Sequence, residues 1–184
     1  MTLLVSGTTG VNLVTDGSIT PIKLSQPMTL MTAVNTTSGT LIDFTGIPSW
    51  VKRVTMIFNG VSTNGTSIIQ LQLGTSGGVV GTGYAYTVQG FNGSGTLTGS
   101  ITTGAVLFNS SLGSISNLII GTVVCTLISG TTWVINHTVS VNANAAAIGG
   151  GNITLGAPLT TMRLTTTSGT DIFDAGSVNV MYEG

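Results

Sequence analysis

Short runs in which apolar and polar residues alternate, separated by glycine-rich turns, are the feature that most limits how this chain can fold. In the clearest run Ile69, Leu71 and Leu73 fall on one face, and Gln70 and Gln72 fall on the other. A period of two residues is typical of a β-strand with one face on a core. At least eight such runs occur, and no segment combines a sustained helical period with capping residues. The sequence therefore predicts an all-β fold, an antiparallel β-sandwich of jelly-roll-like form.

The strand with the strongest signal follows a corner built on Pro48. Proline fixes its own φ and pushes the preceding residue into an extended conformation, so a turn is expected here. Val54, Met56 and Phe58 then alternate with polar residues. We expect a long, half-buried strand, with Trp50 closing the end of a sheet.

A second strong signal predicts a hairpin. Residues 118–127 and 132–141 are both strand-like, and residues 128–131 between them contain a glycine turn. In the second member the residues expected on one face are Trp133, Ile135, His137, Val139 and Val141.

Residues 1–28 differ in their pattern of apolar and polar residues from residues 29–184, which we expect to form the sandwich domain. The first segment consists of short apolar pairs separated by turn residues, so no period lasts long enough to bury a face. We predict an extended N-terminal docking arm, with a short helical turn at residues 18–25. The apolar residues expected to dock on a partner are Val11, Leu13, Val14, Ile19, Ile22 and Leu24.

Charged residues are scarce. Only 5% of the chain is Asp, Glu, Lys or Arg, against roughly 25% in an ordinary soluble protein. A monomer with a net charge of −1 would have little electrostatic protection against association. We infer that much of the surface is covered by other copies of the chain or by a larger assembly, or else that it is an inert hydroxyl and amide surface suited to an extracellular particle.

The same composition argues against two classes of partner. Four basic residues are too few for the phosphate-neutralising patch that nucleic-acid binding requires. The most apolar run, residues 118–128, is interrupted by Gly and Thr and is well short of the roughly 20 residues of a membrane-spanning helix. The first residues also lack the basic region of a secretory signal. We expect neither nucleic-acid binding nor membrane insertion.

Residues for catalysis or metal binding are few. His137 lies in line with apolar residues on a predicted strand face, which favours a core or interface histidine over a general base. Cys125 lies in an apolar run and is expected to be a small core residue. One histidine and one cysteine cannot form a zinc site with three or four protein ligands. We expect no cofactor and no enzymatic activity.

Asp171 and Asp174 are the only acids close together in sequence. A glycosidase needs two carboxyl groups facing each other across a cleft, and a calcium site usually collects more carboxylates. The surrounding Ser, Thr and Gly residues favour a simpler interpretation, in which the aspartates accept hydrogen bonds from backbone N–H groups of a loop. Hydrolysis and cation binding stay as the alternatives.

Three glycine-rich stretches, residues 74–83, 90–104 and 142–156, are predicted to be long loops, where binding sites often occur. The run 145–148 has helical propensity, but the glycines that follow would end a helix. Three aromatic residues lie within or next to these Gly- and Asn-rich stretches: Tyr84, Tyr86 and Phe91. They are a possible glycan-contact loop, with packing at a subunit contact as the alternative.

Three segments together resemble small structural proteins of tailed bacteriophages. They are residues 44–65, beginning Phe-Thr-Gly-Ile-Pro-Ser-Trp-Val-Lys-Arg; residues 163–183, ending Val-Asn-Val-Met-Tyr-Glu; and residues 16–24, which are similar to linkers in phage fibres. The resemblance covers the first 60 and the last 20 residues approximately. It implies a β-rich, usually trimeric, surface-exposed virion protein without enzymatic activity, and it assigns no functional residues.

Two functional hypotheses follow. The first is a structural protein on the virion surface that decorates or cements the capsid or forms a short head fibre, as a homotrimer whose arm binds the major capsid protein or another virion protein. The second is a tail-fibre receptor-binding protein that recognises a host surface glycan.

Overall fold

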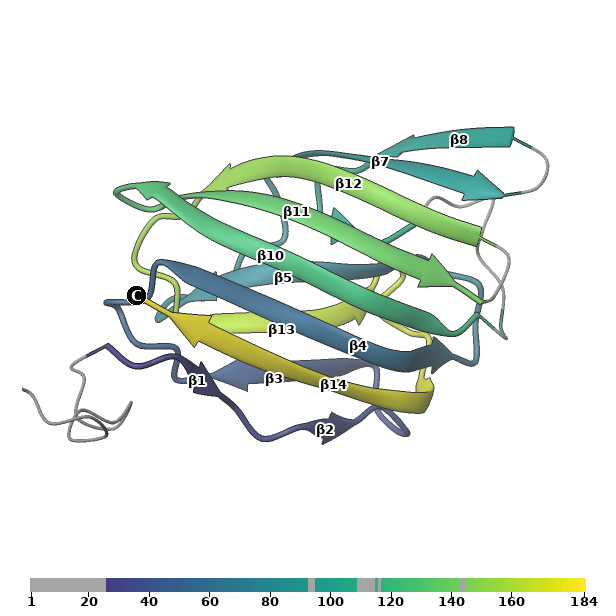
Figure 1. Ribbon diagram of the computed structural model, residues 1–184, viewed down its shortest axis with the longest axis horizontal. Coiled ribbons are helices and arrows are strands. Elements are labelled where there is room, and N and C mark those ends of the chain that lie inside the picture. Colours follow the sequence, from purple (N-terminus) through teal and green to yellow (C-terminus); the bar gives the residue numbers. More distant parts are fainter. Residues whose placement is uncertain (1–25, 93–94, 109–114, 116, 143–144) are drawn as a thin grey trace, which may run out of the picture.

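The computed structural model of the chain describes residues 26–92, 95–108, 115, 117–142 and 145–184. These residues form two antiparallel sheets packed face to face, with no helix (Figure 1). The predicted all-β sandwich is confirmed. Among the described residues no helix has the length and apolarity needed to cross a bilayer.

The large sheet has nine strands in the order β1-β14-β4-β10-β11-β12-β7-β8, with β2 also pairing β14. Its strands are β1 (Thr29–Leu30), β2 (Val34–Asn35), β4 (Arg53–Thr63), β7 (Ala85–Asn92), β8 (Gly95–Ser100), β10 (Ile119–Ser129), β11 (Thr132–Val141), β12 (Ala145–Thr154) and β14 (Phe173–Glu183). The last strand, β14, therefore lies between β4 and the short edge strands β1 and β2.

The small sheet lies behind the large one in Figure 1 and has the order β3-β13-β5-β6, with β9 also pairing β5. Its strands are β3 (Leu41–Thr45), β5 (Ile69–Thr75), β6 (Gly78–Val79), β9 (Ala105–Val106) and β13 (Thr161–Thr166).

One core fills the space between the sheets. Val54, Met56 and Phe58 of β4 are at most 2% exposed, and they meet buried leucines of the small sheet such as Leu71 and Leu164. Burial of each such side chain contributes about 1.5–3 kcal/mol. The alternation predicted for these strands is therefore confirmed by the inward position of its apolar members.

The predicted hairpin is also confirmed. β10 and β11 pair from Ile119 opposite Val141 to Ser129 opposite Thr132, and Gly130 takes a φ of +54° in the connection. The inward residues of β11 run from Trp133 to Val141 and include His137.

The predicted loops are largely wrong. Residues 142–156 contain β12, a ten-residue strand that pairs with β11 along its whole length and with β7 on its other side. The helical propensity of residues 145–148 is overridden by these two ladders. β6 takes residues 78–79, and the β7–β8 pair takes most of the stretch 90–104.

The glycines of β12 are explained by packing between neighbouring strands. A Cβ on Gly149 would lie 2.4 Å from Cε1 of His137, and a Cβ on Gly151 would lie 2.1 Å from the carbonyl oxygen of Ala85. Both contacts are far shorter than van der Waals distance. Glycine is required here because neighbouring strands approach closely, and not because the chain turns.

Residues 1–25 lie outside the described residues, and with them the predicted helical turn and the predicted docking residues Val11, Leu13, Val14, Ile19, Ile22 and Leu24. The described chain starts next to the end of β14, where a Cβ on Gly184 would lie 3.1 Å from Oε1 of Gln26. Trp50 packs edge-on against Tyr182 at this end of the sheet, with ring centroids 5.8 Å apart. The expected position of Trp50 is confirmed.

Candidate functional site

The structure contradicts the exposed aromatic loop predicted at Tyr84, Tyr86 and Phe91. Tyr84 and Tyr86 are 2% and 4% exposed. The Tyr84 hydroxyl accepts a hydrogen bond from the backbone N–H of Leu73 (2.6 Å) and donates one to the carbonyl of Val80 (3.2 Å). Phe91, in β7, is 38% exposed. The two tyrosines are core residues, so their rings cannot stack on a glycan.

Tyr86 is held by His137. The Tyr86 hydroxyl and Nδ1 of His137 share a hydrogen bond, and their rings stack with centroids 5.9 Å apart. Burial lowers the pKa of His137 to about 4, opposed by the main chain of Leu107, so the imidazole is neutral at physiological pH. The interpretation of His137 as a core histidine is confirmed.

Cys125 also lies in the core. It is fully buried in β10, opposite Ile135 of β11, and burial raises the pKa of its thiol to about 12. A thiol in this environment stays protonated and is a poor nucleophile. Cys125 is therefore the small core residue that the sequence predicts.

The two neighbouring aspartates have separate positions. Asp171 accepts a hydrogen bond from the backbone N–H of Ser67 (2.9 Å) and another from the hydroxyl of Ser168 (3.2 Å), which confirms the loop interpretation for this residue. Asp174 is exposed on β14. Across the described ranges, no three His, Cys, Asp or Glu side chains lie close enough together to hold a metal ion.

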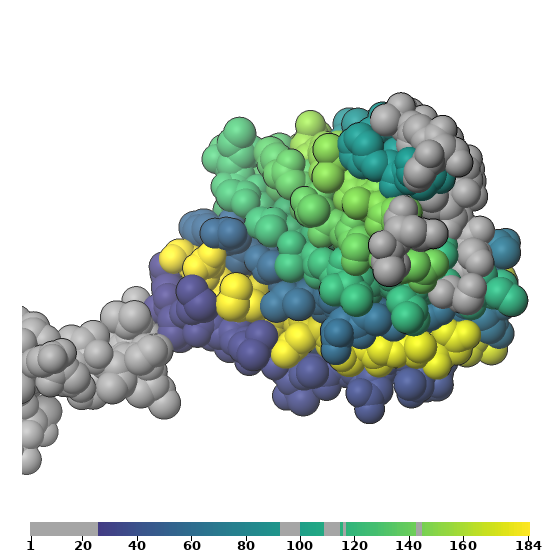
Figure 2. All heavy atoms as spheres, turned by 45° about the vertical axis from the view of Figure 1, so that its right-hand side comes forward, coloured from purple at the N-terminus to yellow at the C-terminus, as the bar shows by residue number. Residues whose placement is uncertain are grey.

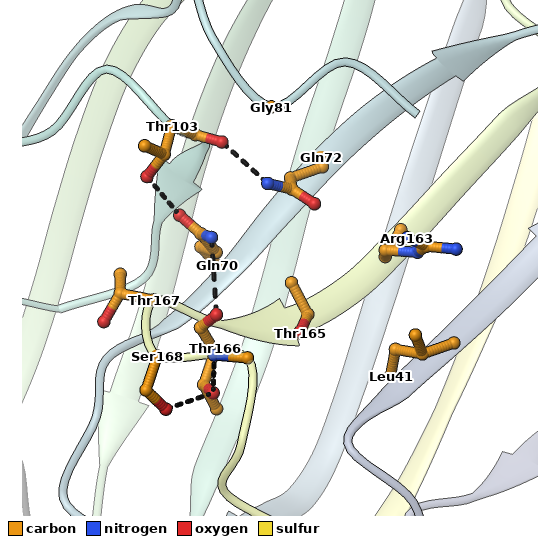
Figure 3. Close-up of a pocket in the computed structure, with 11 residues that line it drawn as sticks. Leu41, Gln70, Gln72, Gly81, Thr103, Arg163, Thr165, Thr166, Thr167 and Ser168 are labelled. Carbon is orange, nitrogen blue, oxygen red and sulfur yellow. Dashed lines mark hydrogen bonds between the residues drawn. The ribbon is translucent and has the colours of Figure 1, made fainter. Parts of the chain in front are cut away.

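A polar hollow of about 350 Å³ lies on the outer face of the small sheet (Figure 3). Its floor is formed by Gln70 and Gln72 of β5 and by Arg163 and Thr165 of β13. Its remaining wall residues are Leu41, Gly81, Thr103, Thr166, Thr167, Ser168 and Gly169. The hollow thus brings together strands of the small sheet and three loops, the β6–β7, β8–β9 and β13–β14 connections.

The amide of Gln70 anchors one side of this polar hollow. Gln70 is only 3% exposed, its Oε1 accepts a hydrogen bond from the hydroxyl of Thr103 (3.0 Å), and its Nε2 donates to the carbonyl of Thr166 (3.4 Å). Gly104 is required beside it, because a Cβ there would lie 2.8 Å from Oε1 of Gln70. Nε2 of Gln72 donates to the carbonyl of Thr103 (2.9 Å).

The one charged side chain lining the polar hollow is neutralised. Nε and Nη2 of Arg163 donate to the two carboxylate oxygens of Asp43 on β3, each at 2.7 Å. These two residues are directly opposite each other in the β3–β13 ladder. The hydrogen bonds that Arg163 donates to Asp43 raise the pKa of Arg163, so the guanidinium keeps its charge, and the formal charges of the two side chains cancel.

A second surface of interest is the outer face of the large sheet, part of which is visible in Figure 2 as the yellow β14, the blue β4 and the green β10–β12. The strand registers arrange its outward residues in rows across the sheet. Three adjacent rows contain no charged residue, and we call them the uncharged face. From β14 to β7 they read Met181, Thr55, Val124, Asn136, Gly150, Thr87; Asn179, Ile57, Thr122, Thr138, Ile148, Gln89; and Ser177, Asn59, Ile120, Ser140, Ala146, Phe91.

Large apolar side chains project from the uncharged face. Ile120 and Ile148 are 50% and 46% exposed. Beside Ile148 is a shallow depression of about 260 Å³, bounded also by Thr87 and Gln89, where Gly149 and Gly150 have no side chains. An ion pair of Arg53 with Glu183 (3.3 Å) lies in the next row toward the end of the sheet.

No family model matches the chain, and it has no significant match among curated proteins or among solved structures.

Proposed function

We propose that the chain is a structural protein on the surface of a bacteriophage particle. In this role it decorates or cements the capsid or forms a short head fibre, and it assembles as a homotrimer. Residues 1–28 dock on the major capsid protein or on another virion protein. The three segments that resemble phage structural proteins support the virion location.

The uncharged face is the observation that carries the assembly part of the proposal. Its three rows combine hydroxyl, amide and aliphatic side chains, and Ile120 and Ile148 are half-exposed within it. Exposed apolar area of this kind marks interaction sites when it is contiguous. An interface between copies needs the same patch, or two complementary patches, on every chain, and a face without charges avoids placing like charges opposite each other.

A charge on this face tests the assembly. We expect Ile120→Lys or Ile148→Lys to weaken self-association at least tenfold, because an unpaired ammonium would be desolvated at the interface. Sedimentation equilibrium measures the effect. Ile128→Lys is the matched control, since Ile128 is 68% exposed near the β10–β11 connection and away from the three rows. A wild-type chain that sediments as a monomer at micromolar concentration would refute the assembly.

Removal of residues 1–28 tests docking separately. The shortened protein is expected to stay soluble and oligomeric and to lose binding to phage particles assembled without the protein, as measured by co-sedimentation. Binding that persists without the arm would contradict its docking role.

A receptor-binding role in a tail fibre is the second candidate, and the polar hollow is the observation that favours it. The hollow lies on the small sheet, away from the uncharged face, so an assembly through the large sheet would leave it accessible.

A further inference from the structure

We propose that the polar hollow on the small sheet binds an uncharged saccharide through Gln72, Arg163 and the hydroxyls around them. The inference deepens the receptor-binding candidate by assigning it a site and a ligand class. It does not depend on Tyr84, Tyr86 or Phe91.

The size and charge of the hollow limit the ligand. A volume of about 350 Å³ is within the range of small-molecule sites. The guanidinium of Arg163 is already paired with both carboxylate oxygens of Asp43, so the site offers no net charge to a phosphate, sulfate or carboxylate. The lining is mostly hydroxyl and amide groups, which does not suit a lipid or another apolar ligand.

The lining is organised before any ligand arrives. Thr103 fixes the amides of Gln70 and Gln72, and Thr165 donates its hydroxyl hydrogen to the carbonyl of Thr40 (2.9 Å). Because these side chains are already ordered, binding would cost little additional side-chain entropy.

Hydrogen-bonding capacity remains after these internal bonds are counted. Within the described part of the chain no partner is seen for Oε1 of Gln72, which can accept, or for Nη1 of Arg163, which can donate. A threonine hydroxyl that donates one hydrogen bond can still accept another. Donors and acceptors on adjacent rigid groups match the neighbouring hydroxyls of a sugar ring, and Leu41, 45% exposed at the margin, offers an apolar contact to ring C–H groups.

Gly81 provides a direct test. Its φ is compatible with any side chain, and a Cβ there would lie 3.6 Å from Nε2 of Gln72, an ordinary contact. Gly81→Tyr would therefore place a ring at the mouth of the hollow without straining the backbone. Gly156→Tyr is the matched control, because a Cβ at Gly156 meets nothing within 4 Å and Gly156 does not line the hollow.

The experiment uses the full-length protein on an array of neutral oligosaccharides of hexoses, 6-deoxyhexoses and N-acetylhexosamines, with sialylated and sulfated glycans beside them. We expect binding to at least one neutral glycan. Titration calorimetry with that glycan should show at least a tenfold loss of affinity for Gly81→Tyr and for Gln72→Met. Affinity should be unchanged for Gly156→Tyr, which adds a ring outside the hollow.

The proposal is overturned by an array on which no neutral glycan binds, by binding confined to acidic glycans, or by affinity that Gly81→Tyr leaves intact. Thermal melting and sedimentation of each variant are the controls that test whether its fold and assembly are retained. A loss of glycan binding in variants that still assemble concerns this site alone, whereas loss of assembly concerns the structural role.

Discussion

At the scale of single residues, the structure depends on two kinds of position. One is a glycine whose neighbours leave no room for a Cβ atom, and the other is a polar side chain that is buried in its neutral form. Gly149 and Gly151 belong to the first kind and His137 to the second. Each of the three contacts the strand next to its own, so a substitution at one position would disturb the packing of the neighbouring strand as well.

The glycine at 151 has a measurable effect on stability. We expect Gly151→Ala to destabilise the fold by about 1–3 kcal/mol, because the added methyl group would lie 2.1 Å from the carbonyl oxygen of Ala85 and a backbone atom cannot easily give way. Urea denaturation measures the difference. Gly156→Ala, which adds a methyl group in open space, should be neutral or slightly stabilising. Equal midpoints for the two variants would contradict the packing argument.

The buried histidine makes stability depend on pH. The pKa of His137 is about 4 in the folded chain and about 6.5 when unfolded, so protonation favours the unfolded state. The stabilisation from neutral His137 is complete above pH 6.5 and is lost as the pH falls from 6.5 toward 4. We expect the free energy of unfolding to fall by about 2 kcal/mol between pH 7.5 and pH 5.

The control for this pH dependence is His137→Gln, which removes the only histidine in the chain. This variant will be less stable at every pH, but its unfolding free energy should be nearly flat between pH 7.5 and 5. A wild-type profile that is also flat would show that the imidazole is protonated, or accessible to water, in the folded protein.

At the scale of strands, local alternation predicts an element only when the strand has a side chain on each face. β4 and β11 follow from the sequence for this reason. β12 does not, because its glycines at 149 and 151 are required by the close approach of His137 and Ala85 on neighbouring strands. A local sequence pattern carries no information about those neighbours. The Gly- and Asn-rich sequence around Tyr84 and Tyr86 also favours an exposed position for these tyrosines, although both lie in the core.

The polar hollow shows the same limit at the proposed binding site. The alternation of Gln70 and Gln72 places two amides on the outer face of one strand, and that part is predictable. Their partners are not, because Thr103 lies 33 residues from Gln70 and Arg163 lies 120 residues from Asp43. Only the sheet topology brings these residues to one place.

The ion pair that joins β3 to β13 gives a prediction at this scale. Asp43 and Arg163 are partly exposed, so their interaction should contribute no more than about 1 kcal/mol. A double-mutant cycle with Asp43→Asn and Arg163→Gln measures it, and added salt should reduce it. The pair of Arg53 and Glu183 is the comparison, and its greater exposure should make the coupling smaller. A larger coupling for the second pair would contradict this ranking.

At the scale of the whole molecule, one continuous core joins the two sheets, so we expect the sandwich to unfold as a unit. Cys125 belongs to this core, on β10 between β4 and β11, and is fully buried. A reagent can reach this thiol only after the sheets separate.

This position makes the single cysteine a probe of global opening. We expect a disulfide reagent such as DTNB to label the folded protein at a rate set by complete unfolding, so that the labelling rate and the urea unfolding curve give the same free energy. Cys125→Ser, which should not react at all, is the control. Fast labelling without denaturant would mean that the large sheet opens locally at β10.

The two ends of the described chain also lie together, with Gln26 beside Gly184 and Trp50 at the side where β1 begins (Figure 1). A peptide fused after Gly184 would start next to Gln26, which belongs to the segment proposed to dock on the capsid, residues 1–28. On a particle it would be held close to the base of the protein and would be poorly displayed. A foreign epitope meant to be seen from outside would have to be inserted elsewhere in the sandwich, away from the end where Gln26 and Gly184 meet.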